Sequence, residues 1–124
     1  MNLIARILVA LAGLFCLFMT VLFWFQTNSA LESFGLLASN AAGLGAARAD
    51  FAAFFGVQAL FAGLTVWKGR GEYALPPLAL MSFAIFGRAL SLIMSGMNEA
   101  VVSGMVVEAI CIAIFAFAWR TLRA

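Results

Sequence analysis

Four long apolar stretches occupy most of this sequence and constrain what it can fold into. They cover about residues 3–25, 47–67, 74–95 and 100–119. A helix of about 20 apolar residues crosses the hydrocarbon core of a bilayer and satisfies its own backbone hydrogen bonds there. With 66% hydrophobic and 10% charged residues, the chain has too little polar surface to coat a soluble globule. The sequence therefore predicts an all-α membrane protein, an antiparallel four-helix transmembrane bundle forming one domain over residues 1–124.

The first apolar stretch has one feature of a signal peptide, because a basic residue, Arg6, precedes it. Its apolar run from Ile7 to Phe25 is longer than the roughly 7 to 15 apolar residues of a signal peptide. We therefore expect this stretch to be a retained helix.

Basic residues near the expected helix ends predict the orientation. If the chain crosses four times, Arg6, Lys68, Arg70, Arg120 and Arg123 all fall on one side. Cytoplasmic flanks of membrane helices carry an excess of Lys and Arg. We therefore expect a multi-pass protein of the bacterial inner membrane with both termini in the cytoplasm.

The segment 26–46 is a long connection on the outer side. Ser29 and Glu32 have the spacing of a capping box, which marks a helix start. The apolar residues that would form its buried face are Leu31, Phe34, Leu36 and Leu37. A short helix on the outer surface is predicted, either as a packed connector or as a lid over a site.

Ionisable residues inside the apolar stretches are the candidate site residues, because a charge there costs about 2.5 to 3.5 kcal/mol on insertion scales. At 1.5 Å per residue, Arg88 and Glu108 both lie about 10 Å below the outer ends of their helices. A short turn joins these two helices, so they must be neighbours. An ion pair between Arg88 and Glu108 is predicted, and it would lower the cost of burying both charges.

The second apolar stretch carries two charges and a stripe of small residues. The stripe residues, which recur at helical spacing, are Ala52, Gly56, Ala59 and Gly63. Such stripes let membrane helices approach closely. Arg48 heads the stripe and is expected to point into the bundle, whereas Asp50, about 160° away on the helical wheel, is expected to face water.

These positions together predict a polar cluster in the outer half of the bundle. Its members are Arg48, Arg88 and Glu108, and Gln58, Ser91 and Ser95 are predicted to line the same pocket. One interpretation is an ion-pair network that fixes the order of the helices. Another is a pocket with one excess positive charge, suited to a small anionic or amphiphilic ligand or a lipid headgroup. Movement of protons or ions through Glu108 is a third.

The residue types that are missing disfavour several classes of protein. Lys and Arg do not form the basic patch of a nucleic-acid-binding protein. There is no His, the commonest general base and metal ligand, and no metal or cofactor is expected. Cys16 and Cys111 lie in apolar stretches, where Cys usually acts as a small hydrophobe, and neither Ser91 nor Ser95 has a base. An enzyme is therefore disfavoured.

Several short motifs resemble those of a known family. They are Arg48-Ala49-Asp50-Phe51 followed by Phe55-Gly56, Gly87-Arg88-Ala89-Leu90-Ser91-Leu92 followed by Gly96, and Glu108. With them the chain resembles the domain-of-unknown-function 4345 family, small bacterial inner-membrane proteins with four helices. The resemblance covers nearly the whole chain. It implies the four-helix fold and the three-residue cluster, and it implies no reaction.

Two functional classes remain from the sequence. The first is a membrane protein that binds a small anionic or amphiphilic ligand or lipid in the outer-half pocket, or that acts as an accessory subunit of a larger membrane complex. The alternative is a transporter or channel for a small solute or ion. It would be a homo-oligomer, because four short helices leave little interior for a path.

Overall fold

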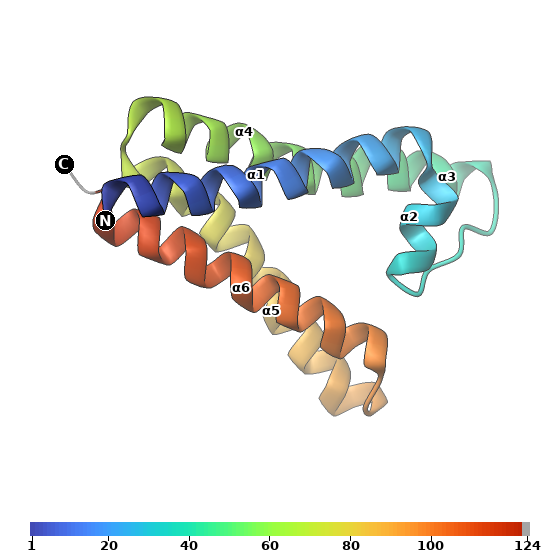
Figure 1. Ribbon diagram of the computed structural model, residues 1–124. Helices are drawn as coiled ribbons and strands as arrows, with labels where there is room; N and C mark the ends of the chain where they lie inside the picture. The colour runs from blue at the N-terminus through green and yellow to red at the C-terminus, as the bar shows by residue number, and fades with distance from the viewer. Residues whose placement is uncertain (123–124) are drawn as a thin grey trace.

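The computed structural model describes residues 1–122, and its regular elements are helices (Figure 1). The long helices are α1 (Asn2–Phe25), α4 (Ala52–Lys68), α5 (Leu75–Ser95) and α6 (Glu99–Thr121). The short ones are α2 (Thr27–Ser33), α3 (Ala41–Ala46), the π-helical η1 (Ala47–Phe51) and the 3-10 helix η2 (Gly71–Ala74). Arg123, one of the basic residues from which the orientation was predicted, lies outside the described residues.

The predicted bounds of three long helices are confirmed to within two residues, because local signals mark their ends. Pro76 lies in the first turn of α5, where its missing N–H is tolerated. Gly96, with a φ of 86°, ends α5. Asn98 then caps α6, since its side-chain oxygen accepts hydrogen bonds from the backbone N–H groups of Ala100 and Val101.

The second apolar helix begins earlier than the sequence predicted. Helical structure runs from Ala41 to Lys68 through α3, η1 and α4. Asn40 is the N-cap, and its Oδ1 accepts a hydrogen bond of 2.9 Å from the N–H of Gly43. The predicted start near Ala47 is wrong because the glycines that indicated a turn lie inside this capped helix.

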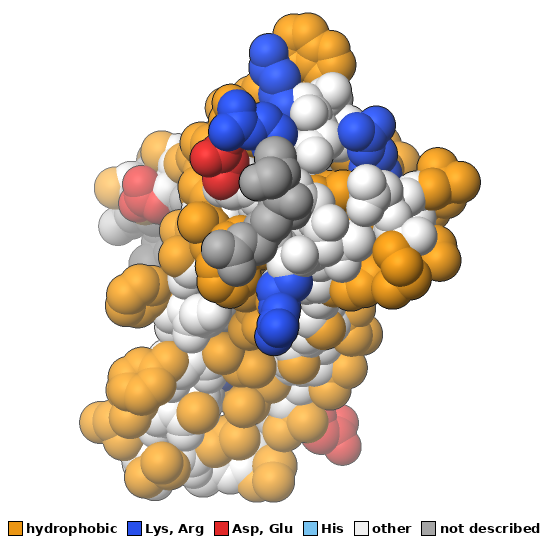
Figure 2. All heavy atoms as spheres, turned by 90° about the vertical axis from the view of Figure 1, so that its left-hand side faces the viewer, with side chains coloured by type: hydrophobic (Ala, Val, Ile, Leu, Met, Phe, Trp, Pro, Cys, Tyr) orange, Lys and Arg blue, Asp and Glu red, His pale blue; other side chains and the backbone are white. Residues whose placement is uncertain are grey.

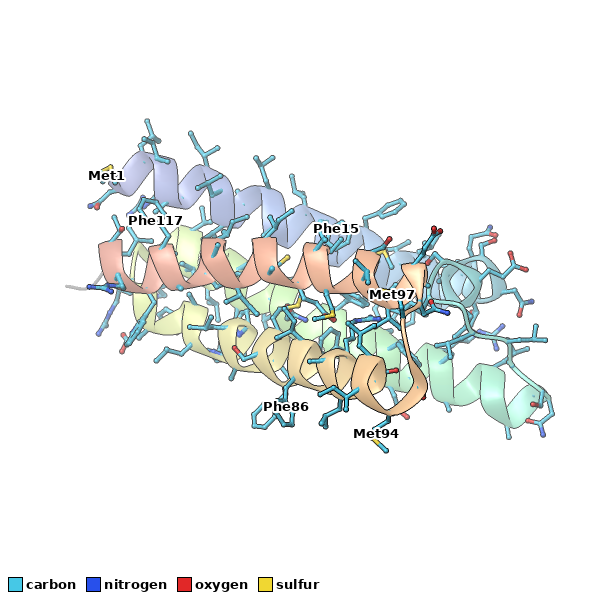
Figure 3. All side chains as sticks on the ribbon, turned by 90° about the horizontal axis from the view of Figure 1, so that it is seen from below. Met1, Phe15, Phe86, Met94, Met97 and Phe117 are labelled. Carbon is cyan, nitrogen blue, oxygen red and sulfur yellow. The ribbon has the colours of Figure 1, made fainter. Side chains whose placement is uncertain are left out.

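The long helices form two pairs, α1 with α4 and α5 with α6 (Figure 1). Both described ends of the chain lie at one end of the molecule, which we call the closed end. The two pairs meet there and diverge toward the other end, which we call the open end. The outward faces are apolar, and Figure 3 shows Phe86 and Met94 of α5 pointing away from the other helices.

Tight contacts hold the closed end together. The N–H of Gly71 in η2 donates a hydrogen bond of 3.1 Å to the carbonyl of Leu122. A Cβ at Gly71 would lie 2.7 Å from the carbonyl oxygen of Ala118, so η2 packs directly on the last turn of α6. The side chain of Arg6 lies over Gly69. Figure 2 faces this end and shows Lys and Arg side chains gathered on it.

The close contact between α1 and α4 uses different residues from the predicted stripe. A Cβ at Gly13 of α1 would lie 2.8 Å from the Cβ of Ala62 on α4. Of the stripe, Ala52 is buried and Gly56 lies beside Thr20, but Gly63 is exposed with no neighbour within 4 Å of an added Cβ. The buried face of α4 is thus rotated relative to the stripe. The prediction that the stripe forms the close helix contact is wrong for its residues near the closed end.

The connection after α1 folds back as α2 at the open end (Figure 1). The predicted capping box does not form, because Ser29 lies inside α2 instead of at its start. The N-cap residue of α2 is Gln26, whose side chain makes no capping hydrogen bond. Leu31 is buried and Phe34 is half-buried, whereas Leu36 and Leu37 are exposed. The prediction of a buried face is therefore confirmed for Leu31 and Phe34 and wrong for Leu36 and Leu37.

Candidate functional site

A cavity of about 660 Å³ lies in the open-end half of the molecule, between the two helix pairs. Side chains from α1, α2, η1, α4, α5 and α6 line it, and most of them are apolar. Ser33 of α2 and Phe34, which follows it, form part of its wall. The C-terminal end of α2 also reaches α6, since a Cβ at Gly35 would lie 3.8 Å from the Cβ of Ala100. The connection after α1 thus contributes directly to the cavity.

Arg88 and Glu108 form an ion pair in the cavity wall, as the sequence predicted. The Nε of Arg88 donates a hydrogen bond of 2.9 Å to Oε2 of Glu108. The Glu108 side chain is 8% exposed and the Arg88 side chain is 25% exposed. The pairing offsets part of the cost of placing each charge among apolar helices.

Two neighbours fix the position of the Arg88 guanidinium. A Cβ at Gly104 would lie within 2.5 to 2.7 Å of the guanidinium, so a larger residue at this position would displace the end of the Arg88 side chain. The guanidinium carbon also lies 5.7 Å from the centre of the Phe34 ring, within the range of a cation–π contact. Arg88 therefore links α5, α6 and the end of α2.

One oxygen of the Glu108 carboxylate is left without a partner. Its Oε1 is buried and accepts no hydrogen bond from any described residue. A buried carboxylate oxygen without a donor is costly, so this atom is an unusual feature of the site.

Phenylalanine side chains form the opposite wall of the cavity. The rings that line it are Phe15, Phe34, Phe51, Phe54 and Phe55. Behind them, the buried Phe23 ring stacks on Phe51 at 5.1 Å and on Phe55 at 6.0 Å between centroids. The sequence analysis missed this wall, although the spacing of Phe51, Phe54 and Phe55 places them on one helix face.

Arg48 and Asp50 lie on the sides opposite to those predicted. Asp50 lines the cavity, whereas Arg48 lines a separate groove with Thr20 and Trp24. Both residues are exposed. The helical wheel grouped these residues correctly, since Arg48 lines the groove with Ala52 and Gly56 while Asp50 lines the cavity with Phe54. The prediction was wrong because the face that carries the small-residue stripe is not the face toward the cavity.

This correction reverses the charge of the cavity. Its charged lining residues are Arg88, Glu108 and Asp50, which leave one excess negative charge instead of the predicted excess positive charge. Asp50 forms no ion pair with any residue in the described range 1–122.

The three predicted lining residues have different environments. Ser91 lines the cavity, and Ser95 is exposed at the end of α5 and does not line it. Gln58 is fully buried in the packed face of α4, outside the cavity lining, and its Nε2 donates a hydrogen bond of 3.2 Å to the Phe54 carbonyl.

Catalytic and metal-binding groups are sparse among the described residues. Cys16 and Cys111 are buried free thiols. No three His, Cys, Asp or Glu side chains in residues 1–122 lie together in a way that could hold a metal ion. The arrangement can bind a ligand through one ion pair, one exposed carboxylate and a wall of aromatic rings.

The fold defines a multi-pass membrane protein, because four of its helices are long and apolar enough to cross a bilayer. Comparison of the chain with protein-family models, curated proteins and solved structures gave no match.

Proposed function

We propose that this protein binds a small amphiphile in the cavity between its two helix pairs. The observation that carries the proposal is the cavity itself, about 660 Å³ of mostly apolar space with an ion pair in its wall. Ligand sites in proteins typically occupy about 300 to 1,000 Å³ and combine apolar walls with a few polar groups. The apolar part of the ligand would contact the phenylalanine wall, and its polar group would lie near Arg88 and Glu108.

The membrane setting follows from the ends of the helices. The closed end carries Arg6, Lys68, Arg70 and Arg120, and we propose that it faces the cytoplasm of a bacterial cell. The four long helices then cross the inner membrane as an antiparallel bundle, with α2 on the outer surface. A reporter active only in the periplasm, fused after Ala124, is expected to stay inactive. Activity of that reporter would overturn the orientation.

Membership of the domain-of-unknown-function 4345 family is a further part of the proposal. It is supported by the motifs around Arg88 and Glu108, two residues that meet in the cavity wall. An alignment of family members that places other residue types at these two positions would contradict it.

A matched pair of glycine variants tests the amphiphile site. Gly87 lines the cavity, and a Cβ added there meets nothing within 4 Å. Gly63 is equally open but lies outside the cavity. Gly87→Leu should fill the site, whereas Gly63→Leu adds the same side chain elsewhere.

Mass spectrometry of protein gently extracted from membranes measures amphiphile that copurifies. We expect the parent protein and Gly63→Leu to retain it and Gly87→Leu to lose most of it. Equal retention in both variants, or no retained amphiphile in the parent, would overturn the proposal.

The alternative class, an oligomeric transporter or channel, has less support. The cavity is lined by no residue of α1 before Phe15 and by no residue of α6 after Glu108. Met81, at its inner limit on α5, is buried. A space that ends halfway through the helices fits a binding site better than a path.

A further inference from the structure

We infer that the polar group of the ligand is an ammonium that carries at least one N–H, attached to a small apolar body. This inference rests on the proposed amphiphile site and adds the chemical class of its ligand. Three features of the cavity carry it: a carboxylate oxygen without a donor, an excess negative charge and a wall of aromatic rings.

The Glu108 carboxylate supplies the first feature. Arg88 donates a hydrogen bond to its Oε2, while Oε1 has no donor among the described residues, and Glu108 lines the cavity. The last torsion of a Glu side chain is broad, so this carboxylate can reorient when a ligand enters the cavity that Glu108 lines. An N–H from a ligand would satisfy this oxygen, and a charged hydrogen bond is stronger than a neutral one.

Charge provides the second feature. Glu108 neutralises Arg88 at 2.9 Å, so the charge that remains in the cavity lining is that of Asp50. An anion entering the cavity would meet this excess negative charge in a medium of low dielectric constant, where repulsion is strong. A cation would be attracted instead.

The aromatic wall is the third feature. The faces of aromatic rings attract cations through their quadrupoles, and the ring of Phe34 already accepts the Arg88 guanidinium at 5.7 Å. The other rings of the wall, such as Phe51 and Phe54, would contact both the cation and the apolar body. A cavity of about 660 Å³ suits a drug-sized molecule rather than a phospholipid with two acyl chains.

Titration of the protein in lipid nanodiscs with decylammonium tests the inference. Matched probes are decyltrimethylammonium, which has the charge but no N–H, and decanoate, which has the opposite charge. Empty discs correct for partition into lipid. We expect decylammonium to bind at one site about tenfold more tightly than decyltrimethylammonium, and decanoate to bind more weakly still.

Three variants assign the binding to the residues named. Glu108→Gln should weaken decylammonium binding about tenfold, because it removes the charge from the hydrogen bond. Asp50→Asn changes an exposed residue, so it leaves folding intact, and should weaken binding about threefold at low salt. Glu32→Gln removes an exposed acid on α2 that does not line the cavity and should change nothing.

The outcomes separate this inference from the proposed function. If decanoate binds as tightly as decylammonium and Gly87→Leu abolishes that binding, the amphiphile site stands and the ammonium inference falls. The inference also falls if Asp50→Asn and Glu32→Gln behave alike. If Gly87→Leu changes the binding of none of the three probes, both proposals fall.

Discussion

The apolar helices of this molecule pack differently at its two ends. At the closed end, glycines bring backbones together, as at Gly71 on the last turn of α6. At the open end the helix pairs diverge around a cavity whose charged lining residues are Arg88, Glu108 and Asp50. In lipid the hydrophobic effect does not drive helices together, so association depends on close packing and polar contacts. Tight packing at the closed end therefore holds the two helix pairs together while they diverge at the open end.

The largest expected effect comes from breaking the ion pair at the open end. Glu108→Leu leaves the charge of Arg88 without its partner and should cost about 3 kcal/mol of unfolding free energy, at the lower end for buried pairs because Arg88 is partly exposed. Arg88→Leu should cost a similar amount.

The double variant Arg88→Leu with Glu108→Leu should recover much of this loss, with a coupling of about 2 kcal/mol in denaturation experiments in mixed micelles. Additive losses would show that the open end does not depend on the ion pair.

A smaller effect is expected from crowding the closed end. In Gly71→Ala the new Cβ would meet the carbonyl oxygen of Ala118 at 2.7 Å, and backbone atoms cannot move aside cheaply. We expect a loss of about 2 kcal/mol in unfolding free energy. Gly63→Ala, with open space around it, serves as the control and should lose nothing. Equal stability of the two variants would contradict the tight packing that defines the closed end.

The contact between α1 and α4 distinguishes the observed helix face from the stripe in the sequence. Gly13→Ala would place a methyl group 2.8 Å from the Cβ of Ala62 and should cost about 1 kcal/mol after the gain in helix propensity. Gly56→Ala, whose nearest neighbour is Thr20 at 3.6 Å, should be neutral or stabilising. The reverse order in thermal unfolding would restore the stripe as the contact face.

The smallest effect concerns the space around Arg88. Gly104→Ala displaces the end of a flexible side chain, whereas Gly87→Ala meets nothing within 4 Å. Both gain helix propensity, so the difference between their unfolding free energies, about 1 kcal/mol or less, measures how firmly Arg88 is held. Identical values would mean that Arg88 moves freely in the open half.

Arg48 and Asp50 show that the sequence did not indicate which face of the second apolar helix is directed toward the cavity. The helical wheel placed Arg48 with Gly56 and Asp50 with Phe54, and the structure keeps these groupings, but the cavity lies on the Asp50 side. The prediction that the stripe on α4 forms the close helix contact was wrong for the same reason. Nearly every face of a membrane helix is apolar, so the pattern of hydrophobic residues does not tell which face is buried.

The sequence by itself determined the four apolar helices, the ends of α1, α5 and α6, and the meeting of Arg88 with Glu108. These follow from local signals. Helix lengths and caps determine how far along its helix each residue lies, and the short turn between α5 and α6 makes these two helices neighbours. Only the tertiary structure decided that the helix pairs diverge, that Asp50 lines the cavity and that Gly13 is the close contact. These depend on the angle at which the helices cross and on which face of each helix its neighbours cover, which short-range sequence signals do not specify.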